Sequence, residues 1–226
     1  MARKSLPKIE RKPVEVQAIE TLREAIVTGA IEPGERITEI NLSEEMNLSR
    51  ATLRSALHQL AQEGLVTLVP YTGWRVLSLG PQDVRELYTL RSALERLAAQ
   101  LVAAGPGGAI RESIGAALAD LSAACAGGTG DEIAEADFAL HKAIIAAAGH
   151  GRLMSQYRLI EQQIRMYIRS SDALLPGGAE IYAQHVPMVE AILAGDAERA
   201  GQLAEEHNLA EGRKLTAHLA ARTAPA

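Results

Sequence analysis

The sequence predicts a mainly α-helical protein with an N-terminal winged helix-turn-helix and a C-terminal all-α bundle of six helices. Three observations predict this fold. Hydrophobic residues make up 47% of the 226 residues but aromatic residues only 3%, and the abundant alanine and leucine favour helices over strands. The order of elements over residues 14–79 is helix, helix, tight turn, helix, hairpin. After residue 80, apolar residues recur at helical spacing between breaks rich in glycine and proline.

We therefore expect a basic, disordered arm at residues 1–12, a winged helix-turn-helix domain at 13–79 and an all-helical domain at 80–226. A single cysteine, Cys125, excludes an internal disulfide framework and fits a reducing compartment. The charged N-terminus does not resemble a signal peptide, and the sequence has no apolar run of 18 residues. These features predict a soluble, cytoplasmic protein with no membrane partner.

The elements of the first half have recognisable ends. We expect helices at about 14–28, 39–46 and 50–63 and a hairpin in the stretch LVTLVPYTGWRVLSL. Glycine and asparagine suit left-handed helix ends, and serine suits an N-cap. The predicted breaks are Gly29, the turn IEPGER, Asn47, the N-cap Ser49 and Gly64.

The third of these helices has an outward face that suits DNA. The net charge is −5, but residues 1–80 hold ten Lys or Arg and ten Asp or Glu, so local placement matters more than the total. A small, polar and basic stripe can enter a major groove, and a glycine in the hairpin turn allows close approach of the backbone. These residues are Arg50, Ala51, Arg54, Ser55, His58 and Gly73. The alternative is a solvated face on a winged helix that binds protein.

The second half predicts six helices in succession. Their ranges are 83–105, 109–128, 131–150, 151–171, 179–195 and 196–219, with Asp196 as the N-cap of the last. Pro187 lies inside the fifth range. Proline has no backbone N–H, so we expect this helix to kink or to start late.

An acid and three histidines lie at helix-interior positions of this half. Asp137 and His141 share one helix face, while His185 and His207 belong to the fifth and sixth helices. Imidazole and carboxylate together suit Zn, Ni, Mn or Fe, and helical bundles commonly hold metals between facing side chains. The alternative is an ordinary helix pair worth about 0.2–0.5 kcal/mol. Spacing alone leaves both interpretations open.

Both halves resemble the GntR family of bacterial transcription regulators, in the branch with an all-helical FCD effector domain. SRATLRSALHQLAQEGLV at 49–66 is similar to the family's S-R-x-P-V-R-E-A-L-x-x-L-x-x-E-G-L-V, and YTGWRV resembles its wing. The resemblance implies that Arg50, Thr52 and Arg54 contact operator DNA and that Gly73 lies in the wing. The departures, Thr52-Leu53 for Pro-Val and Ser55 for Glu, bear on the operator sequence.

The second half carries the other part of the resemblance. R-S-A-L-E at 91–95 is similar to R-x-x-L-E, D-F-A-L-H at 137–141 to D-x-x-F-H, and QHVPMVEAILAGDAERA to E-H-x-x-I-x-x-A-I-x-x-G-D-x-x-A. In many members one Asp and three His bind a divalent metal. The resemblance implies Asp137, His141, His185 and His207 as ligands, with zinc as the first choice. Six effector helices resemble the VanR-like subgroup.

We expect a homodimeric, ligand-responsive repressor that binds a palindromic double-stranded operator and has no catalytic activity. The expected effector is a small organic acid whose carboxylate fills open positions on the metal. Arg91 or Arg165 would bind its second oxygen, and His150 would line the pocket or cap a helix. The alternatives are a direct metal sensor and a metal-dependent enzyme, although no separate general base stands out near the ligands.

Overall fold

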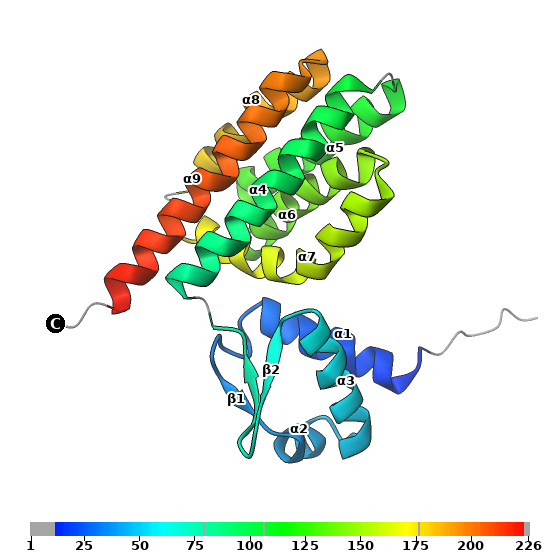
Figure 1. Ribbon diagram of the computed structural model, residues 1–226, viewed down its shortest axis with the longest axis vertical. Helices are drawn as coiled ribbons and strands as arrows, with labels where there is room; N and C mark the ends of the chain where they lie inside the picture. Colours follow the sequence, from blue (N-terminus) through cyan, green and yellow to red (C-terminus); the bar gives the residue numbers. More distant parts are fainter. Residues whose placement is uncertain (1–11, 79, 106, 176, 224–226) are drawn as a thin grey trace, which may run out of the picture. The chain divides into compact units, whose positions relative to one another are not determined.

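The computed structural model describes residues 12–78, 80–105, 107–175 and 177–223. The expected N-terminal arm therefore lies outside the described residues, apart from Lys12. The chain divides into two compact units, of which the first ends at Val76 and the second begins at Leu77 (Figure 1). The fold is mainly helical, with a small sheet confined to the first unit.

The first unit is a winged helix-turn-helix of three helices and three strands. These are α1 (Val14–Val27), β1 (Arg36–Ile37), α2 (Glu39–Glu45), α3 (Arg50–Gln62), β2 (Val66–Val69) and β3 (Gly73–Val76). The sheet order is β1-β3-β2, and both pairings are antiparallel. The expected hairpin is β2 and β3. The expectation of only a turn over residues 31–36 was incomplete, because Arg36 pairs with Arg75 and Ile37 with Trp74.

The helix breaks predicted for this unit have the backbone conformations expected of helix ends and caps. Gly29, Asn47 and Gly64 have φ values of 79°, 50° and 71°, which end the helices before them. Ser49 caps α3, since its Oγ accepts a hydrogen bond of 3.1 Å from the Thr52 N–H. The apolar face of α3 is fully buried through Leu53, Ala56, Leu57 and Leu60, which leaves the opposite face to solvent.

The second unit is a bundle of six helices. They are α4 (Pro81–Ala104), α5 (Gly108–Gly127), α6 (Gly130–Ala147), α7 (Gly151–Asp172), α8 (Gly178–Ala194) and α9 (Ala197–Thr223). Helix α9 lies alongside α4 in Figure 1. Gly212 permits this close packing, because a Cβ there would lie 2.7 Å from the Cβ of Tyr88.

The ends of the last two helices test two expectations. Asp196 caps α9 through a hydrogen bond of 3.0 Å from the Arg199 N–H to its Oδ1, as predicted. Helix α8 begins at Gly178 and continues through Pro187, so the expected late start was wrong. Tertiary packing offsets the lost hydrogen bond, since Ile181, Met188 and Val189 of α8 are all buried.

The core of the second unit contains an unusual number of charged and polar side chains. Arg, Glu and Asp are rarely buried unless they are paired. Those with less than a tenth of their surface exposed include Arg91, Glu95, Asp137, His141, His185, Asn208 and Glu211. Within the described residues, every helix is too short or too polar to span a lipid bilayer.

Candidate metal centre and nucleic-acid interface

Three helices bring the expected metal ligands together inside the second unit. Asp137 and His141 come from α6, His185 from α8 and His207 from α9. One ring nitrogen from each histidine lies within 4.8 Å of the others. His141 and His185 are each only 1% exposed. The histidines therefore face one another in the interior of the bundle.

The distances between the donor atoms fit a single cation. The Nε2 atoms of His141 and His185 are 3.1 Å apart. The carboxylate of Asp137 lies between them, with Oδ1 3.2 Å from His141 Nε2 and Oδ2 3.3 Å from His185 Nε2. Nitrogen and oxygen ligands that surround one zinc ion at about 2.0–2.2 Å are roughly 3.0–3.5 Å from each other. His141, His185 and Asp137 therefore already have the spacing of a coordination shell, and the His207 ring nitrogen lies within 4.8 Å of the other two imidazole nitrogens.

Two of the imidazoles are held with the same nitrogen pointing inward. His141 Nδ1 is 2.8 Å from Glu95 Oε2, and His185 Nδ1 is 2.8 Å from the Ile181 carbonyl oxygen. Both partners are acceptors, so each Nδ1 carries a hydrogen, and each ring presents an Nε2 lone pair when it is neutral. Asp137 Oδ1 is buried and has no hydrogen-bond donor. Lone pairs that converge in this way need a positive charge among them.

The pKa shifts show the same need for positive charge, which a proton on His185 can supply while no metal is bound. Burial alone would raise the pKa of Asp137, but His185 and His141 hold it well below its usual value. Burial, followed by the charges of His185 and His141, lowers the pKa of His207 well below its usual value. His207 is therefore neutral, the form in which histidine binds metals. Burial would lower the pKa of His185, yet Asp137 raises it.

Beside the cluster lies a buried ion pair on α4. Arg91 Nε donates to Glu95 Oε1 at 2.7 Å, and Asn208 Nδ2 donates to Glu95 Oε2 at 2.8 Å. Burial alone would raise the pKa of Glu95, but Arg91 and His141 hold it well below its usual range. Arg91 Nη2 is buried without a hydrogen-bond partner. Glu95 appeared in the sequence only as part of a motif and Asn208 drew no attention, since both look like solvated helix residues.

The other two expected effector residues have different surroundings. Arg165 Nε donates to Glu135 Oε1 of α6 at 2.5 Å, and the Arg165 side chain is 15% exposed. His150 is the N-cap of α7, where its Nδ1 accepts a hydrogen bond of 3.2 Å from the Leu153 N–H. Within the described residues, His150 forms no hydrogen bond, ion pair or ring contact with the three histidines.

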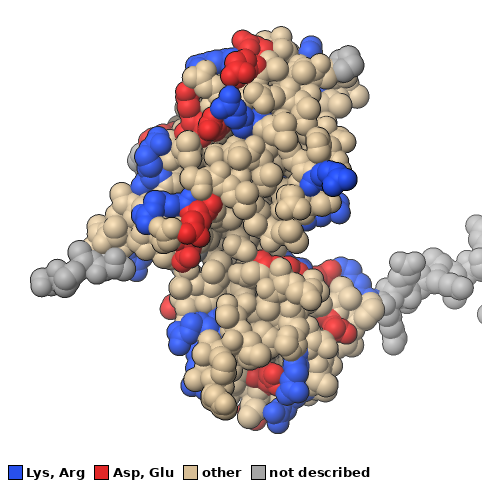
Figure 2. Space-filling view, in the orientation of Figure 1, with Lys and Arg blue, Asp and Glu red and all other residues tan. Residues whose placement is uncertain are grey.

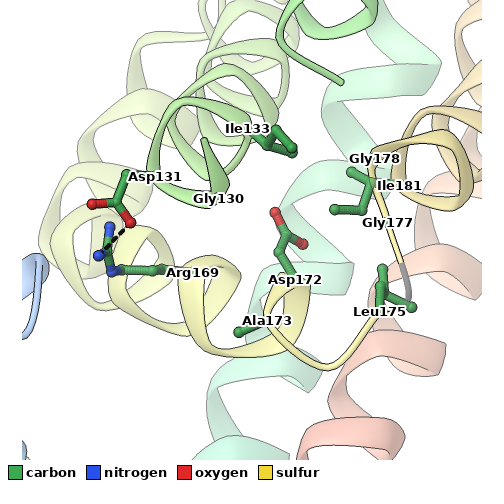
Figure 3. A pocket seen from close by; sticks show the side chains of 10 residues that line it. All are labelled: Gly130, Asp131, Ile133, Arg169, Asp172, Ala173, Leu175, Gly177, Gly178 and Ile181. Carbon is green, nitrogen blue, oxygen red and sulfur yellow. Dashed lines mark ion pairs between the residues drawn. The ribbon is translucent and has the colours of Figure 1, made fainter. Parts of the chain in front are cut away.

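A cavity of about 330 Å³ lies between α6, α7 and α8. Figure 3 shows the carboxyl group of Asp172 pointing into it and the ion pair of Arg169 with Asp131 at one side. Ile181 lines the cavity and also holds His185 through its carbonyl oxygen. Burial, followed by the charge of Asp137, raises the pKa of Asp172 to about 8. Sequence reasoning missed Asp172, because an acid near a helix end usually faces solvent.

The expected DNA-contacting residues occupy the exposed face of α3. Arg50 and Arg54 are exposed, and positive and negative side chains are interspersed over the face of the first unit seen in Figure 2. Arg54 donates from Nε and Nη2 to the two carboxylate oxygens of Glu39, at 3.0 and 2.7 Å. The Thr52 hydroxyl is 2.8 Å from the Ser49 hydroxyl, at the start of the helix. Arg54 is thus held in one orientation by α2.

Gly73 has a structural reason to be glycine. Its φ is 101°, and a Cβ there would lie 3.0 Å from the Ile37 carbonyl oxygen of β1. The neighbouring Tyr71 also has a positive φ of 63° and is fully exposed at the turn between β2 and β3. The turn therefore presents a bulky side chain to its surroundings, while the role of Gly73 in DNA contact stays a prediction.

Comparisons with known proteins identify both units. Residues 86–210 match the family model "FCD domain", and residues 15–76 match "Bacterial regulatory proteins, gntR family". A probable D-xylose utilization operon transcriptional repressor of Paenarthrobacter nicotinovorans is 29% identical over 213 residues, which cover 93% of this chain and 92% of the relative. The uncharacterized HTH-type transcriptional regulator YdhC of Bacillus subtilis (strain 168) is 37% identical over 90 residues, 40% of each chain.

The fold is likewise similar to that of a solved relative. The crystal structure of a GntR transcriptional regulator from Rhodococcus sp. RHA1 superposes with a TM-score of 0.74 at 22% identity, over 89% of this chain and 96% of that one. The family models and the fold agree on the same two units in the same order. The chain belongs to the GntR family of bacterial regulatory proteins, with an FCD domain after its winged helix-turn-helix, and is a DNA-binding transcriptional regulator.

Proposed function

We propose that this regulator is a repressor whose FCD domain binds one divalent transition metal through Asp137, His141, His185 and His207. The supporting observation is the convergence of two Nε2 lone pairs on the Asp137 carboxylate, with both Nδ1 atoms already used. A bound cation removes the repulsion among these acceptors and satisfies the orphaned Asp137 Oδ1. Imidazole and carboxylate donors suit Zn, Ni, Mn or Fe, and zinc is the first choice.

The proposed effector is a small organic acid. Four protein ligands leave positions open on a metal whose coordination number exceeds four, as zinc's sometimes does, and the metal supplies positive charge there for a carboxylate. Arg91 supports an anionic ligand, because its buried Nη2 has no partner in the described structure. The cavity of about 330 Å³ beside Ile181 has the size of a small-molecule pocket, but Arg91 and the four ligands do not line it, so the acid proposal rests on the metal and Arg91. The proposed role of this site is binding rather than catalysis.

We further propose that two chains bind a palindromic operator, with one α3 helix in each half-site. Leu90 and Leu97 support a dimer face on α4, since they are 49% and 41% exposed and lie seven residues apart on one helix face. The effector would act by binding one arrangement of the paired DNA-binding domains more tightly than the other. Light scattering should give a dimer for the wild type and a monomer for Leu90→Glu/Leu97→Glu. A dimer in both would place the interface elsewhere.

The metal proposal is tested by titrating chelator-treated protein with Zn²⁺ and measuring stoichiometry by elemental analysis and affinity by calorimetry. We expect one Zn²⁺ per chain for the wild type. His207→Ala should weaken binding at least tenfold, whereas His218→Ala, at an exposed position of the same helix, should leave it unchanged. Wild-type protein that takes up no Zn²⁺, or equal affinities for both variants, would refute the proposed site.

The acid proposal is tested with fluoroacetate as the probe, followed by ¹⁹F NMR. We expect saturable binding to the zinc-loaded wild type and weaker binding to Arg91→Gln. Equal binding by Arg91→Gln and the wild type would show that Arg91 does not hold the carboxylate. Binding that is also equal with and without zinc would place the acid away from the metal.

A further inference from the structure

Glu95 joins the candidate metal ligands to the candidate anion-binding arginine. Its side chain is 3% exposed, and its two carboxylate oxygens have separate tasks. Oε2 lies 2.8 Å from His141 Nδ1, and Oε1 accepts the 2.7 Å hydrogen bond from Arg91 Nε. Asn208 of α9 donates to Oε2 as well, at 2.8 Å. The Glu95 carboxylate on α4 therefore contacts His141 of α6 and Asn208 of α9, and it also accepts a hydrogen bond from Arg91 of the same helix.

The contact to His141 decides which ring nitrogen can bind a metal. A carboxylate that accepts hydrogen bonds from Arg91 and Asn208 is an acceptor toward His141 too, so the hydrogen of the imidazole stays on Nδ1. The free lone pair is then on Nε2, which faces Asp137 and His185. Carboxylate partners of this kind orient metal-binding histidines and make them more basic.

The contact to Arg91 decides where the guanidinium points. The hydrogen bond from Nε to Glu95 fixes the plane of the group, and Nη2 is left buried without a partner. Arg91 has 2% of its surface exposed, so this donor is shielded from bulk solvent. Glu95 thus positions both Arg91, a hydrogen-bond donor for an anion, and His141, a candidate ligand for a cation.

We infer that Glu95 is a positioning residue that couples the two binding events, so that metal occupancy strengthens carboxylate binding and the reverse. The inference rests on the proposed function of the site. Because Glu95 contacts both side chains, a ligand that fixes the His141 ring also fixes Glu95, and through it the Arg91 guanidinium. Thermodynamic linkage requires that the acid then strengthens metal binding by the same factor.

The test uses the full-length protein and the variant Glu95→Gln, which keeps the shape and removes the charge. Zn²⁺ affinity is measured with and without fluoroacetate, and fluoroacetate affinity with and without Zn²⁺. For the wild type we expect each ligand to strengthen the other about fivefold or more. For Glu95→Gln we expect Zn²⁺ affinity to fall roughly 10- to 100-fold and the coupling factor to fall to about one.

A spectroscopic measurement separates positioning from a general loss of structure. In ¹⁵N NMR spectra of the metal-stripped protein, His141 should be the Nδ1–H tautomer in the wild type and a mixture in Glu95→Gln. The matched control is Glu198→Gln, whose side chain is 78% exposed on α9 and pairs with Arg96. It should match the wild type in all measurements.

Loss of the Glu95 charge also leaves Arg91 buried without its partner, which could prevent folding. The pair Arg91→Gln and Arg91→Gln/Glu95→Gln avoids this problem, because the double variant has no buried charge at either position. We expect the double variant to bind Zn²⁺ at least tenfold more weakly than Arg91→Gln alone.

The outcomes distinguish this inference from the proposed function. Wild-type protein that binds no Zn²⁺ refutes the metal site itself. Wild-type protein that binds Zn²⁺ with the expected coupling, together with a Glu95→Gln variant of unchanged affinity and coupling, refutes the inference and leaves the metal site intact. Zn²⁺ and acid binding without coupling in the wild type also refutes it.

Discussion

The arginine–glutamate pair Arg91–Glu95 of the second unit and the pair Arg54–Glu39 of the first differ chiefly in burial. Arg91 and Glu95 are 2% and 3% exposed, while the side chains of Arg54 and Glu39 are 56% and 17% exposed. The buried pair has lost its water, so each group depends on the other and on its neighbours. The exposed pair is screened and contributes little to stability. The same chemistry therefore builds a core site in one unit and orients a surface side chain in the other.

The largest expected effect comes from breaking the buried pair. Arg91→Ala should lower the free energy of unfolding by about 3–5 kcal/mol, because it leaves the Glu95 carboxylate buried without its cation. Arg54→Ala should leave the stability nearly unchanged, since solvent replaces the lost contact. Urea denaturation of both metal-stripped variants, followed by circular dichroism, checks the contrast. Equal decreases in the free energy of unfolding for the two variants would mean that burial does not determine how much each pair contributes to stability.

The exposed pair should matter for DNA instead. Arg54→Ala should weaken binding to a selected operator roughly ten- to hundredfold, because the guanidinium held by Glu39 is an expected base contact. Electrophoretic mobility shifts at fixed salt measure this. Arg152→Ala, an exposed arginine on α7, serves as the control. Unchanged operator affinity for Arg54→Ala would favour the protein-binding alternative for this domain.

A smaller effect concerns Asp172. Its folded-state pKa of about 8 lies above its ordinary value of 3.8, so the folded protein binds this proton more tightly than the unfolded chain. Stability should therefore fall as pH rises from about 4 to about 8. Asp172→Asn cannot lose this proton, so its stability should not fall over this pH range for that reason. It should be more stable than the wild type by about 1–3 kcal/mol near pH 8. Thermal unfolding of metal-stripped protein at pH 5 and pH 8 checks this, and an equal difference at both pH values would contradict it.

The smallest expected change in stability follows from Glu39→Gln. The amide keeps one acceptor for Arg54 but removes the charge, so the unfolding temperature should shift by no more than about 4 °C. Operator binding should weaken less than in Arg54→Ala, since the arginine remains but is less firmly oriented. A Glu39→Gln variant whose unfolding temperature is lower by much more than this would show that the surface pair stabilises the fold.

Local signals in the sequence sufficed for most of the fold. Ser49, Asp196 and Gly29 end or begin their helices as expected, because caps depend on neighbouring backbone groups alone. Strand β1 was missed, since a stretch of two residues shows no alternation and forms only against β3. Pro187 did not delay α8, because packing of its neighbours outweighs one lost hydrogen bond.

The site was less accessible to sequence reasoning. Asp137 and His141 share a helix face by simple periodicity, but the approach of His185 and His207 depends on how three helices pack. Glu95 and Asp172 were not singled out, because their importance comes from burial and from partners distant in sequence. A charged residue on a helix looks the same in sequence whether water or another helix covers it.

A short stretch of chain joins the two units. Val76 ends β3 and Pro81 begins α4, the helix that carries Arg91 and Glu95. Five peptide units reach at most about 18 Å even when fully stretched. The chain itself therefore keeps the end of β3 and the start of α4 within that distance. If a bound ligand affects operator binding through this connection, inserting glycines and serines after Val76 should weaken the effect.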